Sequence, residues 1–168
     1  MTAPIDEQPS AILNITPGDL TDPRVIDLLR IHLSNARAES PAESVHALDL
    51  DGLRKPDITF WSAWEAEQLA AVGALRALAS DHGEVKSMHT AEALRRRGAG
   101  GAMLRHIIGT ARSRGYSRLS LETGSSPYFD NARALYARHG FGACAPFGDY
   151  GADPFSVYQT LDLRQADG

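Results

Sequence analysis

One glycine-rich turn constrains this chain more than any other segment. Glycines stand at positions 98, 100 and 101, between a predicted strand and a predicted helix, directly after the triplet Arg95-Arg96-Arg97. Glycine has no Cβ, so backbone N–H groups here can approach a ligand closely. Cations alone would oppose the dipole at a helix N-terminus, whereas a bound anion is stabilised by both the cations and the dipole. The segment therefore predicts an anion site, with a phosphate group as the expected ligand.

Two well-known phosphate-binding motifs do not fit this turn. A Walker loop requires Gly-Lys-Ser or Gly-Lys-Thr after the glycines, and neither is present. A dinucleotide fingerprint requires a third small residue where Met103 stands, and it follows the first strand of a fold instead of lying mid-chain. A nucleoside triphosphatase is thus disfavoured, and an NAD(P)-dependent oxidoreductase remains only as a distant alternative.

The overall composition is that of an ordinary globular protein. Its 168 residues, 43% of them hydrophobic, suit a single domain over 1–168, with residues 1–10 expected to form a disordered tail. The first ten residues are polar and acidic, and no apolar run approaches about 18 residues, so we expect a cytoplasmic protein without a membrane partner. The single cysteine, Cys144, excludes an internal disulfide and disfavours a metal site. The net charge of −4 argues against nucleic acid as a partner.

Hydrophobic periodicity, capping residues and turn residues together predict an α/β chain. Asp22 followed by Pro23 predicts a helix start. Ser40-Pro41-Ala42-Glu43 has the pattern of a capping box for a second short helix, and a connector is expected from there through Leu53. The remaining expected elements are a strand at 11–15, a first helix to about 37, a hairpin of strands 58–63 and 69–78, a strand at 84–90, a helix from 97, a strand at 119–121, a helix ended by Gly140 and a strand at 155–161. This order indicates a mixed sheet with flanking helices.

The glycine-rich turn resembles the acyl-coenzyme A loop of a known family. Arg95-x-x-Gly98-x-Gly100 is similar to the loop of the GNAT family of N-acetyltransferases, whose pattern is Gln or Arg, two residues, Gly, any residue, then Gly or Ala. The resemblance continues in Leu119-Ser-Leu-Glu-Thr123 and in Asn131-Ala-Arg-Ala-Leu-Tyr136-Ala-Arg-His-Gly140-Phe141. It covers roughly residues 64–161. The segments Ile58–Trp64 and Glu84–Met88 are similar to a small bacterial subgroup whose acceptor is unassigned.

The resemblance implies both a fold and an activity. The fold is a mixed, mostly antiparallel and twisted sheet of six to seven strands, flanked by about four helices and splayed between its central strands. The activity is transfer of an acetyl group from acetyl-CoA to a primary amine of a small molecule or peptide, by direct attack in a ternary complex and without a metal. A homodimer is frequent among such proteins. A non-catalytic acyl-CoA binding or sensing domain is the main alternative.

The resemblance also implies roles in the chemistry. Glu84 matches the carboxylate that deprotonates the amine, with a solvent-exposed strand-end acid as the alternative. Tyr136 matches the acid that protonates the departing thiolate, with a purely structural core tyrosine as the alternative. Asn131 could hydrogen-bond the pantetheine arm or cap a helix.

Further residues are expected to contact the two substrates. The residues expected at the coenzyme are Met88, His89, Thr90, Arg95, Arg96, Arg97, Gly98, Ala99, Gly100 and Gly101. The residues expected at the acceptor are His46, Trp61 and Glu122. Residues 37–67 hold seven acidic and three basic side chains, which favours a cationic amine, although a solvated acidic face would look the same.

Overall fold

The computed structural model describes residues 12–164, so the predicted tail at 1–10 lies outside the described residues. The described chain contains seven strands and four α-helices in mixed order. The strands are β1 (Leu13–Pro17), β2 (Ile58–Glu65), β3 (Gln68–Ala79), β4 (His82–Thr90), β5 (Arg118–Gly124), β6 (Gly142–Ala143) and β7 (Ser156–Asp162). The helices are α1 (Pro23–Glu39), α2 (Leu50–Leu53), α3 (Ala99–Ser113) and α4 (Asp130–Arg138), with 3₁₀ turns η1 (Ala42–Ser44), η2 (Glu92–Leu94) and η3 (Pro127–Phe129).

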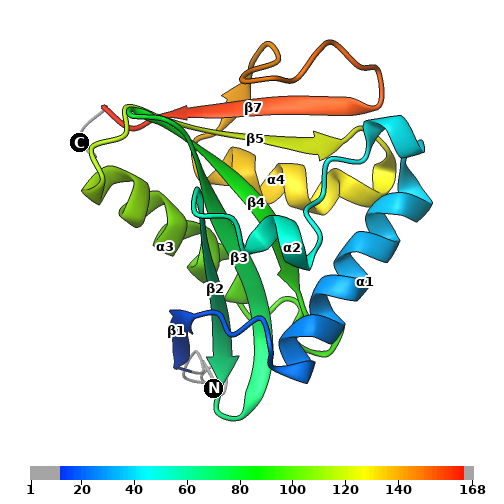
Figure 1. The fold of residues 1–168 in the computed structure, drawn as a ribbon, viewed down its shortest axis with the longest axis vertical. Coiled ribbons are helices and arrows are strands. Elements are labelled where there is room, and N and C mark those ends of the chain that lie inside the picture. The colour runs from blue at the N-terminus through cyan, green and yellow to red at the C-terminus, as the bar shows by residue number, and fades with distance from the viewer. Residues whose placement is uncertain (1–11, 165–168) are drawn as a thin grey trace, which may run out of the picture.

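All seven strands form one sheet in the order β1-β2-β3-β4-β5-β7-β6. Every neighbouring pair is antiparallel except β4 and β5, which run parallel. That parallel pairing joins only His82–Glu84 to Arg118–Ser120, although both strands continue well beyond it. Figure 1 shows the two strands starting together at the upper left and separating toward the right. The predicted mixed sheet with splayed central strands is therefore confirmed.

Two hydrophobic cores cover the two faces of the sheet. On one face, α3 and α4 pack over a core that includes Leu75, Met103 and Leu121. On the other face, α1 and α2 pack over Val25, Leu28, Phe60 and Val72, among others. Strand β3 supplies alternate residues to both cores, which explains why its sequence reads as a nearly continuous apolar run.

Most helix and strand boundaries lie close to where the sequence predicts them, with a few exceptions. Asp22 caps α1 as predicted, and its side chain accepts a hydrogen bond from the Arg24 N–H. The capping box at residues 40–43 is wrong: Pro41 takes the cap position, no side chain caps the turn, and only the 3₁₀ turn η1 forms. The connector predicted through Leu53 instead contains α2, capped by Asp49. The two-residue strand β6 was not predicted.

Two further observations concern the described chain as a whole. Within residues 12–164, no helix is long and apolar enough to cross a membrane. In the same residues, no three His, Cys, Asp or Glu side chains gather in a group that could hold a metal ion.

Close packing of α3 on β3 depends on Gly73. A Cβ added there would lie 2.7 Å from Met103 Cγ, which is fully buried, whereas a Cβ on Gly109 of the same helix would meet nothing within 4 Å. We expect Gly73→Ala to lower the free energy of unfolding by about 1–3 kcal/mol through overpacking. Gly109→Ala should instead raise it by up to about 1 kcal/mol, because alanine favours the helix. Urea unfolding followed by circular dichroism measures both, and a Gly73→Ala protein as stable as wild type would contradict this account.

Candidate functional site

The separation of β4 and β5 opens a cleft of about 650 Å³. Residues from α1, η1, β4, the start of α3, β5, η3 and α4 line it. From β4 onward its lining includes the predicted coenzyme residues Met88, His89, Thr90, Arg95, Arg96, Gly98, Ala99, Gly100, Gly101 and Asn131. The predicted side chains are therefore brought together in one place, although they span more than forty positions of sequence.

The glycine-rich turn leaves the N-terminus of α3 uncovered at this cleft. Gly98 has φ +85° and Arg96 has φ +66°, so both residues adopt a left-handed backbone conformation just before α3 begins at Ala99. No side chain caps the helix there, so its first backbone N–H groups have no capping partner. At Gly100 a Cβ would lie 3.1 Å from Thr90 Oγ1. The turn thus presents backbone donors at the end of a 15-residue helix, as anion binding requires.

Cations surround this end of the cleft, but one of the three predicted arginines faces elsewhere. Arg95 and Arg96 line the cleft, and Arg138 joins them from α4. Arg97 is absent from the lining, and its Nη2 instead lies 2.7 Å from Glu65 Oε1 on β2. The predicted contact of Arg97 with the coenzyme is therefore not supported by its position, because an ion pair with the hairpin holds the side chain away.

A β-bulge shapes the β4 wall of the cleft. The register between β3 and β4 shifts between Val72 and Ala74, and Ser87 adopts φ +55°. Two residues of β4 consequently oppose one residue of β3, which bends and twists the strand. Beyond Glu84 this edge of β4 has no pairing with β5, so its backbone groups are open to a ligand.

Tyr136 reaches the cleft from α4. Its side chain is almost fully buried against Phe141, and burial raises the pKa of its hydroxyl above the ordinary value of 10, so it carries its proton at neutral pH. Asn131 lines the cleft from the first turn of the same helix. Because α4 begins at Asp130, the alternative that Asn131 caps the helix is wrong.

Glu84 lies deep in the protein rather than at a solvent-exposed strand end, so that alternative is wrong. Only 1% of its surface is exposed. Its Oε2 accepts hydrogen bonds from Tyr150 Oη at 2.5 Å and from Lys86 Nζ at 3.4 Å, while Arg76 Nη1 lies 4.0 Å from Oε1. The residue does not line the main cleft; it borders a second cavity of about 480 Å³, whose wall also includes His46 and Tyr150.

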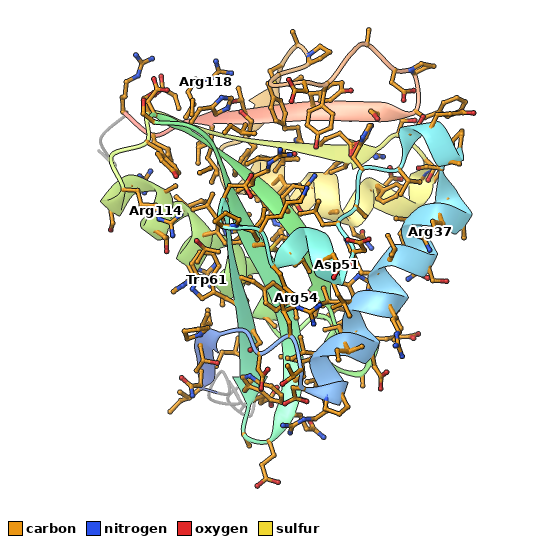
Figure 2. All side chains as sticks on the ribbon, viewed as in Figure 1. Arg37, Asp51, Arg54, Trp61, Arg114 and Arg118 are labelled. Atoms are coloured by element: carbon orange, nitrogen blue, oxygen red, sulfur yellow. The ribbon has the colours of Figure 1, made fainter. Side chains whose placement is uncertain are left out.

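The three predicted acceptor residues have different positions. His46 borders both cavities, and Glu122 lines the main cleft from β5. Burial raises the pKa of Glu122 to about 7, against the opposing effects of the Ser156 hydroxyl and Lys86. Trp61 is 7% exposed, packs in the core against His106 of α3 and lines neither cavity. Figure 2 labels it on the side of the sheet where α3 lies. Its predicted contact with substrate is not supported by this position.

Two histidines meet on the wall of the cleft. His32 Nδ1 of α1 and His89 Nδ1 of β4 lie 3.2 Å apart. Burial lowers the pKa of each imidazole to about 4; His89 and Lys86 add to the effect at His32, and Arg95 adds to it at His89. Both rings are therefore neutral at pH 7, and one donates a hydrogen bond to the other.

Comparison with known proteins agrees with this geometry. The model of the acetyltransferase (GNAT) family matches residues 25–141, well over half of the chain. The chain belongs to the acetyltransferase (GNAT) family. It is 51% identical over 151 residues to the N-acetyltransferase YsnE of Bacillus subtilis, covering 90% of this chain and all of that protein. It is 49% identical over 152 residues to the N-acetyltransferase YedL of Escherichia coli, covering 90% of this chain and 96% of the relative.

A solved structure has the same fold. An acetyltransferase from Bacillus subtilis in complex with CoA superposes with a TM-score of 0.68 at 21% identity, covering 90% of this chain and 99% of that one. The fold, the family model and the named relatives together identify this GNAT protein as an N-acetyltransferase.

Sequence reasoning missed several residues of the site. The sequence analysis assigns Lys86 no role, yet its ammonium group donates to Glu84, Tyr150 and the His46 carbonyl. It likewise assigns no role to His32 or Arg138, which both line the cleft. No local signal identifies them, because Lys86 meets His46 and Tyr150, and His32 meets His89, across 40 or more residues of sequence. Arg138 joins the cleft from a separate helix, α4.

The histidine pair predicts a pH dependence of stability. Because each folded pKa lies below the ordinary 6.5, the unfolded chain binds more protons between pH 6.5 and about 4. The pair's contribution is therefore complete above pH 6.5 and falls as the pH drops, by up to about 2 kcal/mol for each histidine between pH 7 and pH 5. A His32→Gln/His89→Gln protein should lose less stability than wild type over this interval in urea unfolding. Parallel losses in the two proteins would rule out the pair as the cause.

Proposed function

We propose that this GNAT protein transfers the acetyl group of acetyl-CoA to a primary amine of a small molecule or peptide, by direct attack in a ternary complex. The observation that carries the proposal is the uncapped, arginine-flanked N-terminus of α3 opening into the cleft between β4 and β5. A pyrophosphate matches these donors and charges in sign and in hydrogen-bonding character. The unpaired edge of β4 suits the amide groups of a pantetheine arm.

The proposed coenzyme contacts follow from the lining of the cleft. Arg95, Arg96 and the backbone of residues 98–101 would hold the pyrophosphate, and Met88–Thr90 with Asn131 would hold the arm. Acetyl-CoA supplies an activated thioester carbonyl. The backbone N–H near Met88 would polarise that oxygen, and the buried hydroxyl of Tyr136 would give a proton to the departing sulfur.

The proposal also includes where and in what form the protein acts. We infer a cytoplasmic protein, since its single cysteine suits a reducing compartment. We infer a homodimer from its family resemblance. Analytical ultracentrifugation at micromolar concentration tests the second point, and a mass of 18.1 kDa would refute it.

Calorimetry and a thiol-release assay test the proposed reaction. The purified protein is titrated with acetyl-CoA and then with NAD. Thiol release is then followed with glycine, spermidine, phenethylamine and a tripeptide as acceptors. Binding of acetyl-CoA with release on adding one amine class supports the transferase. Binding without release supports the acyl-CoA sensing alternative, and binding of NAD alone supports the oxidoreductase.

The arginines of the loop provide a matched pair of variants. Arg96 lines the cleft, whereas Arg97 pairs with Glu65. Loss of a charge-assisted contact with a phosphate costs about 1.5–3 kcal/mol. We therefore expect Arg96→Ala to weaken acetyl-CoA binding by roughly 10- to 100-fold in calorimetry. Arg97→Ala should change the affinity by less than about threefold, because an exposed ion pair contributes little. Equal losses in both variants would refute the assignment.

Tyr136 is tested by removing only its hydroxyl. Tyr136→Phe keeps the buried ring and deletes the proposed acid, so we expect kcat to fall by about 100-fold while acetyl-CoA affinity stays nearly unchanged. Thiol-release assays measure kcat, and calorimetry measures the affinity for acetyl-CoA. Unchanged turnover would remove Tyr136 as the acid, and lost affinity would indicate a structural role instead.

A further inference from the structure

The side of the main cleft that is formed by α1 and η3 carries no charged side chain and holds two aromatic rings. We propose that this side binds an acceptor with a single primary amine on an aromatic body. The inference rests on the proposed function, because it names the class of acceptor for the same reaction. It excludes polyamines and other acceptors that carry a second positive charge.

The uncharged side of the cleft is called the α1 wall below. It consists of Ala36 and Ser40 of α1, Val45 and Ala47 of the segment after η1, and Tyr128 and Phe129 of η3. His32 and His46 also line this side. Burial is the main cause that lowers the pKa of both imidazoles below the ordinary 6.5, so both are neutral at pH 7.5.

The α1 wall lies away from the glycine-rich turn. Helix α3, which begins at that turn, packs on one face of the sheet, whereas α1 packs on the other. Ala36 and Ser40 are four positions apart, so they share the face of α1 that lines the cleft. Figure 1 shows the end of α1 beside the loop that follows β5. A coenzyme held at the turn would therefore leave the α1 wall to the acceptor.

Two hydrogen bonds between distant residues hold the α1 wall in place. Asn35 Nδ2 donates to Tyr128 Oη at 2.8 Å and joins α1 to η3 across 93 positions of sequence. Ser44 Oγ donates to Asp153 Oδ2 at 2.6 Å and fixes the segment after α1. A wall that is ordered before binding loses less entropy when a rigid ligand docks, which favours a ring over a flexible chain.

The two aromatic rings of the α1 wall stand at its exposed edge. Tyr128 is 43% exposed, and its bond to Asn35 limits the movement of the ring. Phe129 packs edge-to-face against Tyr128, with 5.0 Å between ring centroids. A Cβ added to Gly124 would overlap the Phe129 ring, so this ring rests directly on the backbone of β5. An aromatic acceptor can stack on the pair or pack against its edges.

The charged side chains elsewhere in the main cleft disfavour a second ammonium group. Among the lining residues of the described chain, the only acid is Glu122. The bases of the same lining are Lys86, Arg95, Arg96 and Arg138. A second ammonium group on the acceptor would thus meet mainly positive charge.

The acidic residues of segment 37–67 do not change this balance, because none of the seven lines the main cleft. Asp49 caps α2, and Asp51 forms an ion pair with Arg54. Asp57 and Glu65 form ion pairs with other arginines. The remaining three acids are exposed: Glu39, Glu43 and Glu67. The acidic composition of the segment therefore belongs to ion pairs and to the solvated surface, and it gives no support to a polyamine.

The second cavity is more acidic, but Lys86 stands at its border with the main cleft. Asp57, Glu84 and Asp149 line the second cavity, and Lys86 lines both. Its ammonium group lies 3.4 Å from Glu84 Oε2 and 3.0 Å from Tyr150 Oη. A polyamine extending from the main cleft into the second cavity would bring its next ammonium group against this buried positive charge.

Matched amines test both parts of the inference on the wild-type enzyme at saturating acetyl-CoA. Hexylamine and 1,6-diaminohexane differ by one ammonium group, and we expect kcat/KM from thiol release to be about tenfold higher for hexylamine. Phenethylamine and 2-cyclohexylethylamine differ in aromaticity. We expect kcat/KM to be about two- to tenfold higher for phenethylamine, because aromatic pairs interact more strongly than their buried area alone implies.

Substitution of Tyr128 tests the aromatic pair. We expect Tyr128→Ala to raise the KM for phenethylamine by roughly tenfold, while kcat and the calorimetric affinity for acetyl-CoA stay within about twofold. The KM for hexylamine should rise less. Tyr128→Phe keeps the ring and loses only the bond to Asn35, so it should show part of this effect.

Adding a charge to the α1 wall tests the electrostatic part. We expect Ala36→Glu to raise kcat/KM for 1,6-diaminohexane relative to hexylamine by about tenfold, because the new carboxylate attracts the second ammonium group. Ala38→Glu adds the same charge at an exposed position of α1 that does not line the cleft, and it should leave the ratio unchanged. Ser40→Glu adds the charge one turn later and replaces Ala36→Glu if that variant does not fold.

Three results would overturn the inference: a wild-type enzyme that uses the diamine as well as hexylamine, one that uses the cyclohexyl amine as well as phenethylamine, or a Tyr128→Ala enzyme that loses affinity for acetyl-CoA instead of the acceptor. Failure of the proposed function gives a different result. A wild-type enzyme that binds acetyl-CoA but releases no thiol with any amine, charged or aromatic, would refute the proposed function and this inference with it.

Discussion

The short parallel pairing of β4 and β5 is the constraint on which the rest of the molecule depends. The two strands share hydrogen bonds over three residues each and then separate, while every other strand pair in the described sheet is antiparallel. Unpaired backbone groups inside a protein are costly, so an open edge of this kind is maintained by the surrounding structure. Here α3 and α4 on one face and α1 on the other hold the strands apart (Figure 1).

The residues that line the two ends of this opening differ in charge. At the α3 end, Arg95, Arg96 and Arg138 surround an uncapped helix N-terminus, so the local field favours an anion even though the whole chain has a net charge of −4. Further along, His32 and His89 are kept neutral by burial. The cleft thereby has a cationic end at α3 and an uncharged stretch of wall at the two histidines.

A cluster of polar groups borders the second cavity. The cluster of Glu84, Lys86 and Tyr150 places two formal charges and a hydroxyl where water is largely excluded. Such a cluster is tolerated only when its members satisfy one another, and it fixes their geometry for the same reason.

The sequence by itself determined the order of the main elements and the glycine-rich turn before α3. Both are local properties: Asp22 and Pro23 start a helix wherever they stand, and glycines before a helix leave its N–H groups accessible. It also identified most of the residues that line the cleft from β4 to the start of α3, because they follow one another along the chain.

Only the tertiary structure decided which of those side chains face the cleft. Arg97 turns to Glu65, and Trp61 enters the core. A bulge at Ser87 bends β4, and pairing across 57 residues brings His32 to His89. Whether Glu84 or Glu122 lines the main cleft depends on strand register, bulge position and distant partners, which are long-range packing properties that no local pattern encodes.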